Sequence, residues 1–371
     1  MSDAPPRKPL PELAPLVRTK RKGRGAASNT DGRFEPYRHE AADDGWGVLD
    51  ESIGRVATTV ETDTARSVIN HNDSPDIPFD QSINPYRGCE HGCIYCYARP
   101  SHSYLGLSPG LDFETRLFAK YDAAARLVEE LRAPGYRPSP IALGINTDAY
   151  QPVERRLRLS RAILEVLAAC EHPLTIVTKS ALVERDLDLL APMAAKNLVR
   201  VFFSITTLDH ELARKLEPRA TAPQRRLQAL SALNEAGVPA GVMVAPVIPV
   251  LTDAELESIL DAAHAAGARS AGYVLLRLPH EVKDLFKEWL VLHAPLAAEH
   301  VMVRVREARG GKENDPNFGT RMTGQGEYVN MIRHRFRLAC RRLGLNARER
   351  AELDTTRFRP PAAAGDQLKL L

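Results

Sequence analysis

Short apolar runs alternate with segments of helical periodicity along most of the chain. The runs are almost continuously hydrophobic, which is typical of strands buried on both faces of a parallel sheet. They predict strands near 82–86, 140–146, 173–178, 199–206, 240–248 and 271–277. Apolar residues at a 3.6-residue period predict helices near 121–133, 154–171, 184–195, 223–236, 253–266 and 281–293.

Six strand–helix units predict an α/β fold, specifically a partial (β/α)6 TIM-like barrel with N-terminal and C-terminal extensions. Functional residues then belong at the carboxyl ends of the strands. We expect five regions: a disordered basic leader (1–45), an N-terminal extension (46–80) with strands within 53–70, the barrel (81–294), a C-terminal extension closing over the barrel (295–350), and a flexible tail (351–371). Within the C-terminal extension, 301–306 resembles a strand and 324–343 a basic helix.

The composition is that of a globular protein, with 44% hydrophobic and 26% charged residues, and it argues against collagen-like, coiled-coil and wholly disordered chains. The net charge of +3 hides two basic segments, residues 1–25 and 333–350. Both segments could contact phosphates. Alternatively, residues 1–25 are a solvated tail and residues 333–350 the exposed face of a helix. No apolar run is long enough to span a membrane and no secretory signal is evident, so we expect a cytoplasmic protein.

Three of the five cysteines lie within eight positions, as Cys89, Cys93 and Cys96 in a C-x3-C-x2-C spacing. We call residues 88–97 the cysteine loop. Three thiolates this close can bind one compact metal centre. Three cysteines are one short of an ordinary [4Fe-4S] site, which would leave one iron open to a small molecule. A zinc site with His91 or His102 as fourth ligand is the alternative, and the other two cysteines fit core positions in helices.

Polar residues follow several of the predicted strands. Thr147 and Asp148 follow the second strand, Lys179 the third and Arg219 the fourth, while Ser204 lies late in the fourth. Singly, such residues could be helix caps or surface charges. As a set at successive strand ends, they would surround one ligand.

The cysteine spacing, with aromatic Tyr95 just before the last cysteine, resembles the signature of the radical S-adenosylmethionine superfamily. The resemblance implies a [4Fe-4S] cluster on the three cysteines, S-adenosylmethionine bound at the open iron, and an electron donor such as flavodoxin or ferredoxin. It also implies that one-electron reduction of the sulfonium releases methionine and a 5′-deoxyadenosyl radical, which abstracts hydrogen from a substrate.

The runs CIYCYARP, TDAYQP, TIVTKS and GVMVAPVIPVLTD resemble the spore photoproduct lyase-related branch, often described as DNA repair photolyases, over about residues 80–280. The resemblance implies that Tyr97 returns hydrogen to the product radical. It also implies that Thr147, Asp148, Lys179 and Ser204 contact S-adenosylmethionine. We add Tyr95 and Arg219 to this set of expected contacts. One feature departs from the branch: no cysteine precedes Thr147 within 144–148, where true spore photoproduct lyases carry a hydrogen donor.

The function expected from these features is radical chemistry on a DNA lesion or another nucleic acid. The alternatives are a radical enzyme acting on a peptide or small molecule, and a non-catalytic iron–sulfur or redox-sensing protein. The C-terminal Gln367-Leu368-Lys369-Leu370-Leu371 resembles the motif by which bacterial repair proteins bind the sliding clamp, with Leu371 in place of the usual Phe. A leucine tail that folds back on the barrel is the alternative.

Overall fold

The computed structural model describes residues 21–35, 56–347 and 352–361. Its main sheet has seven strands in the order β10-β9-β8-β7-β6-β3-β2, all parallel except the edge strand β2. The strands are β2 (Ile69–His71), β3 (Gln81–Ile83), β6 (Ile141–Leu143), β7 (Leu174–Thr178), β8 (Val199–Ser204), β9 (Ala240–Val247) and β10 (Ala271–Leu275). The six predicted parallel strands are therefore confirmed, and they form an open sheet.

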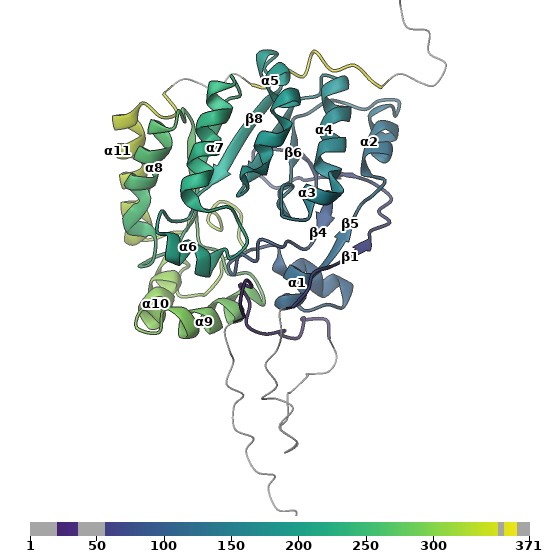
Figure 1. Cartoon of the computed structure of the whole chain (residues 1–371). Coiled ribbons are helices and arrows are strands. Elements are labelled where there is room, and N and C mark those ends of the chain that lie inside the picture. Colours follow the sequence, from purple (N-terminus) through teal and green to yellow (C-terminus); the bar gives the residue numbers. More distant parts are fainter. Residues whose placement is uncertain (1–20, 36–55, 348–351, 362–371) are drawn as a thin grey trace, which may run out of the picture.

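Helices that follow the strands cover one face of this sheet (Figure 1). The α-helices that follow these strands are α2 (Ala123–Leu131), α3 (Glu154–Leu157), α4 (Leu159–Ala169), α5 (Leu187–Ala195), α6 (His210–Leu216), α7 (Pro223–Glu235) and α8 (Leu256–Ala265). The short 3-10 helices are η2 (Arg99–Leu105), η3 (Ala181–Asp186) and η4 (Asp253–Glu255). The helix predicted over 154–171 is divided at Arg158, whose φ of 56° lies in the left-handed region.

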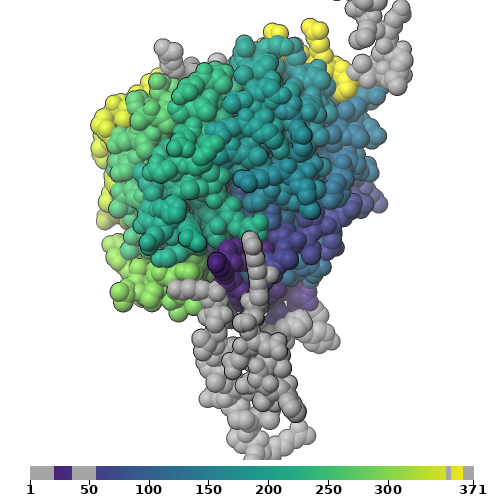
Figure 2. Space-filling model, viewed as in Figure 1, coloured from purple at the N-terminus to yellow at the C-terminus, as the bar shows by residue number. Residues whose placement is uncertain are grey.

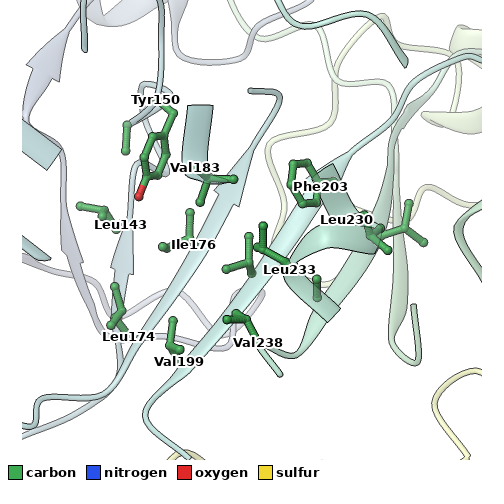
Figure 3. Close-up of a cluster of buried hydrophobic side chains, with 14 of the residues drawn as sticks. Leu143, Tyr150, Leu174, Ile176, Val183, Val199, Phe203, Leu230, Leu233 and Val238 are labelled. Carbon is green, nitrogen blue, oxygen red and sulfur yellow. The ribbon is translucent and has the colours of Figure 1, made fainter. Parts of the chain in front are cut away.

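The main core lies between the sheet and these helices. Alternate residues of β7 and β8, such as Ile176 and Phe203, pack against Leu230 and Leu233 of α7 (Figure 3). All four side chains are fully buried. Burial of this apolar area is the dominant stabilising contribution, and it fixes the direction in which the strand ends point.

A second, three-stranded sheet has the order β1-β5-β4, from β1 (Thr59–Thr62), β5 (Arg116–Ala119) and β4 (Tyr86–Arg87). Strands do form within 53–70, as expected, but they do not pair with each other. β1 runs parallel to β5, whereas β2 extends the main sheet beside β3. Together with α1 (Leu111–Thr115), the small sheet lies next to the cysteine loop.

The C-terminal region consists of α9 (Val282–His293), α10 (Ala298–Ala308) and α11 (Glu327–Leu343). The strand expected at 301–306 is wrong, because Val301, Met302, Val305 and Ala308 are buried at helical spacing. The basic helix is confirmed. It packs beside α8, where Arg335 pairs with Glu257 at 2.5 Å, so it flanks the outer helix layer.

Residues 21–35, which we call the N-terminal segment, are part of the folded structure. This corrects the expectation of disorder for that part of the 1–45 leader. Ser28 Oγ donates to Glu288 Oε2 of α9 at 2.8 Å, and the Asn29 amide donates to Asp112 of α1 at 3.0 Å. Figure 2 shows the segment in purple between the green α9–α10 region and the blue-purple region of the small sheet. The rest of the leader and the Gln367–Leu371 pentapeptide lie outside the described residues.

Candidate functional site

The cysteine loop follows β4 at the carboxyl end of the parallel strands. Backbone hydrogen bonds attach it on two sides, from Cys89 N to Phe113 O at 2.9 Å and from Ile94 N to Leu216 O at 3.0 Å. Gly92 has a φ of 67°, and a Cβ atom there would lie 2.8 Å from the carboxylate of Glu114. The loop therefore needs glycine at this position and is anchored to α1 and α6.

Buried polar contacts join the N-terminal segment to the cysteine loop. Glu114 accepts hydrogen bonds from Gly25 N at 3.0 Å and Ala26 N at 2.8 Å, and it pairs with buried Arg99 at 2.5 Å. Arg99 also donates to Cys93 O at 2.9 Å. A Cβ atom on Gly25 would lie 1.8 Å from Gly92 O, so the two backbones are in direct contact.

The three loop cysteines are free thiols that lie near one another. Cys89 and Cys93 are buried and Cys96 is half-buried. Burial and the neighbouring charges of Asp148, Cys93 and Cys96 raise the pKa of the Cys89 thiol. Three unpaired thiols on one anchored loop are the donor set that a cubane with one open iron requires.

The two histidines considered as zinc ligands are engaged elsewhere. His91 Nδ1 lies 3.4 Å from Asp148, and His102 Nε2 lies 2.9 Å from Arg116 O. In the described part of the chain, no three His, Cys, Asp or Glu side chains converge to bind a single metal ion. A cubane is held through three different irons, so its cysteines need not converge on one point. The arrangement favours a cluster over mononuclear zinc.

Asp148 connects the carboxyl ends of β6 and β7. Its carboxylate accepts hydrogen bonds from Thr178 Oγ1 at 2.8 Å, from Lys179 N at 2.7 Å and from Tyr150 N at 2.8 Å. Burial opposes ionisation, but His91 and these donors outweigh it and lower the pKa of Asp148 to about 2. An ionised carboxylate is thus held beside the cysteine loop.

Lys179 is the cation at the centre of the strand ends. Its Nζ donates to Ser204 Oγ at 2.7 Å and lies 5.8 Å from the centre of the Tyr95 ring. None of the ion pairs within the described residues involves Lys179, so its charge is available to an anionic ligand group. Lys179 and Ser204, predicted from separate strands, are thus brought together next to the loop.

A buried polar network holds the hydroxyl group of Tyr95 in place. Its hydroxyl donates to Glu217, which also accepts from Thr206 Oγ1 at 2.8 Å and pairs with Arg226. All four side chains are buried. Burial opposes ionisation of Glu217, but Arg226 and Lys179 outweigh it and lower its pKa to about 2. Because its hydroxyl is used inside the protein, Tyr95 can offer only its ring to the site.

Glu217 belongs to the polar run that follows the fourth predicted strand, whereas Thr206 and Arg226 are parts of the site that were not predicted from the sequence. A signal for Arg226 was present, because it lies at helical spacing with buried Leu227, Leu230 and Leu233. An arginine on the buried face of a helix requires an anionic partner.

Three other predicted residues have contacts of a different kind. Thr147 Oγ1 donates to Tyr86 O at 2.9 Å, and Arg219 pairs with Glu90 of the cysteine loop at 2.9 Å. Both therefore support the loop through contacts within the protein. Tyr97 is exposed by 44%, and its hydroxyl donates to Ile145 O at the end of β6. Tyr97 thus lies at the strand end where the branch-specific cysteine is absent.

Comparison with protein families gives a match over residues 83–263 to the radical SAM superfamily. Residues 83–263 of this chain therefore resemble a radical SAM domain. Members of this superfamily use a [4Fe-4S] cluster and S-adenosylmethionine, and the three cysteines and the Lys179–Ser204–Asp148 set described above lie within the matched region.

Three relatives described as uncharacterised match part of this chain. A Mycobacterium tuberculosis protein is 43% identical over 221 residues, which cover 59% of this chain and 65% of the relative. A Methanocaldococcus jannaschii protein is 29% identical over 173 residues, covering 47% and 62%. An Acidianus two-tailed virus protein is 32% identical over 172 residues, covering 45% and 56%. The chain thus matches less than two thirds of the length of these relatives.

Spore photoproduct lyase structures have a similar fold. The complex with dinucleoside spore photoproduct has a TM-score of 0.53 and 17% identity, covering 76% of this chain and 79% of that one. A variant with bound AdoMet and dinucleoside spore photoproduct has a TM-score of 0.53 and 16% identity, covering 76% and 78%. At this identity the likeness concerns the fold.

No helix in the described part of the chain could span a bilayer.

Proposed function

We propose that this protein is a radical enzyme that reductively cleaves S-adenosylmethionine and abstracts hydrogen from a nucleic-acid substrate, with a DNA lesion as the first candidate. The observation that carries the proposal is the placement of Lys179, Ser204 and Asp148 beside three free cysteines, one fewer than the four thiolates of an ordinary [4Fe-4S] site. A protein that only stored a cluster would not need an available cation and an ionised carboxylate beside an open iron.

Each residue of the set has a role suited to the cofactor. The cluster and S-adenosylmethionine, when bound, supply one electron and the radical that removes hydrogen from the substrate. Lys179 would neutralise the methionine carboxylate, Ser204 would orient the ammonium group of Lys179, and Asp148 would fix the Lys179 backbone. The Glu217–Arg226 pair would hold the Tyr95 ring next to Lys179. Arg219 and Thr147 would keep the loop in place.

Tyr97 is the proposed source of hydrogen for the product radical. It directly follows Cys96 and reaches the end of β6, and no cysteine lies in residues 141–148. Similarity of fold to spore photoproduct lyase complexed with a dinucleoside spore photoproduct supports nucleic acid over a peptide as the substrate. The proposal also includes an electron donor of the flavodoxin or ferredoxin class and, separately, a sliding clamp bound through Gln367–Leu371.

The test is anaerobic incubation of the cluster-loaded protein with reductant, S-adenosylmethionine, and either UV-irradiated or undamaged oligonucleotides. We expect 5′-deoxyadenosine from the reduced protein and a changed product only from the damaged strand. Lys179→Met should suppress 5′-deoxyadenosine formation, whereas Lys196→Met, which removes a surface charge paired with Glu171, should not. A fully reduced, cluster-loaded protein that forms no 5′-deoxyadenosine would instead support the redox-sensor alternative.

A further inference from the structure

An arginine that forms no ion pair with any of the described residues lies beside Tyr97. Arg277 follows β10, and its guanidinium carbon is 5.9 Å from the centre of the Tyr97 ring. Its Nη1 donates to the Met322 sulfur at 3.1 Å, a weak acceptor, and its buried Nε has no hydrogen-bond partner. No ion pair among the described residues includes Arg277. Burial and the charge of Arg321 lower its pKa, as expected for a cation held near another cation.

The position of Arg277 is fixed by a second, buried arginine. Arg309 donates to Leu276 O at 2.7 Å, immediately before Arg277, and also to Thr320 O at 3.0 Å and Arg321 O at 2.9 Å. It therefore ties the end of β10 to the turn that carries Arg321. These hydrogen bonds hold the partly desolvated guanidinium of Arg277 where a ligand could supply an anion.

Exposed aromatic rings lie at both ends of this pair of cations. Phe318 is 59% exposed, and the Arg321 guanidinium carbon lies 4.5 Å from its ring centre. Tyr97, 44% exposed, is at the other end, next to Cys96. Arg321 is already paired with Asp76 at 2.6 Å, which leaves Arg277 as the principal site for an anion. We call Tyr97, Arg277, Arg321 and Phe318 the arginine–aromatic row.

We propose that the arginine–aromatic row binds a single-stranded stretch of nucleic acid, with Arg277 contacting a phosphodiester and the rings of Tyr97 and Phe318 stacking on bases. Guanidinium groups bind phosphates and aromatic faces stack on any base, and this combination is the usual one in proteins that bind single strands. An acidic peptide would use the cations but would leave the two exposed rings without a role. The inference rests on the proposed function and adds the residues that bring the substrate to the site.

The test is a fluorescence-anisotropy titration of cluster-loaded protein with a labelled single-stranded oligonucleotide of about twelve nucleotides. Arg277→Gln should weaken binding about tenfold and reduce the slope of log K against log salt by about 0.7, because one phosphate contact is lost. Phe318→Ala should weaken binding about tenfold without changing that slope. Arg225→Gln, which removes the same charge from a surface pair with Glu184, is the matched control and should leave binding unchanged.

A second variant and a second readout separate the possible failures. Arg277→Lys keeps the charge and should retain the salt slope, which distinguishes loss of a phosphate contact from misfolding. Cleavage of S-adenosylmethionine without oligonucleotide should be unchanged in Arg277→Gln and Phe318→Ala.

Normal cleavage of S-adenosylmethionine together with equal oligonucleotide affinity in all variants would refute nucleic-acid binding by the arginine–aromatic row. The proposed radical chemistry would be unaffected. The same conclusion follows if wild-type protein cleaves S-adenosylmethionine but shows no saturable binding up to about 100 µM oligonucleotide, or if an acidic peptide of equal charge binds more tightly. Absence of cleavage in wild-type protein would instead count against the proposed function.

Discussion

Replacing Arg226 by Met should strongly destabilise the protein, because it leaves the carboxylate of Glu217 buried without its cation. Glu217 is 3% exposed and Arg226 is 1% exposed. The pKa of Glu217 is held at about 2 against an ordinary 4.5, which corresponds to about 3 kcal/mol in favour of the ionised form. Arg226 also donates to Ser204 O at 2.8 Å and Thr221 O at 2.6 Å, and loss of these bonds adds about 1 kcal/mol. We expect a total loss of about 4 kcal/mol at pH 7.

The assay is urea unfolding of cluster-free protein, followed by far-UV circular dichroism and tryptophan fluorescence, so that unfolding is not coupled to loss of iron. The double variant Arg226→Met/Glu217→Leu is the control, because it removes both charges. It should be more stable than the single variant by about 2 kcal/mol, since a buried ion pair costs more when broken than when replaced.

The pH dependence gives a further check. The pKa of Glu217 is lower in the folded protein than its ordinary value, so the stability it contributes is complete above about 4.5 and is lost as the pH falls towards 2. The difference between wild type and Arg226→Met should therefore shrink between pH 5 and pH 3. A loss below about 1 kcal/mol at pH 7, or a double variant no more stable than the single one, would refute the buried-pair argument.

Three further predictions concern the cofactor side of the site. Changing any one cluster cysteine to Ala should abolish iron binding in anaerobic reconstitution, whereas Cys340→Ala should retain the iron and lose only about 1 kcal/mol of stability; equal iron content in both would contradict the cluster assignment. Lys179→Met should weaken S-adenosylmethionine binding at least tenfold by equilibrium dialysis with unchanged iron content, with Lys196→Met as control. Gly25→Ala should speed oxygen-induced loss of the cluster absorbance, because the new Cβ would lie 1.8 Å from Gly92 O; wild-type loss rates would show that the N-terminal segment does not protect the loop.

Several features of the fold follow from local sequence pattern. The apolar runs predicted all six parallel strands because a strand buried on both faces needs an almost unbroken apolar stretch. The error at 301–306 has the same origin. Over so short a segment, Val301, Val303 and Val305 fit a two-residue period, whereas Val301, Met302 and Val305 fit a helical one. Only packing against α9 decides between the two.

The sequence alone determined the cysteine loop, the strand–helix order and the polar residues at the strand ends, because each depends on spacing within a few residues. Tertiary structure alone decided which distant groups meet. Tyr95 and Glu217 are 122 residues apart, and Arg277 reaches Tyr97 only because β10 ends beside the cysteine loop. Such pairings depend on strand register and on where helices cross, which local spacing does not specify, and they are the contacts that turn a cysteine motif into a site.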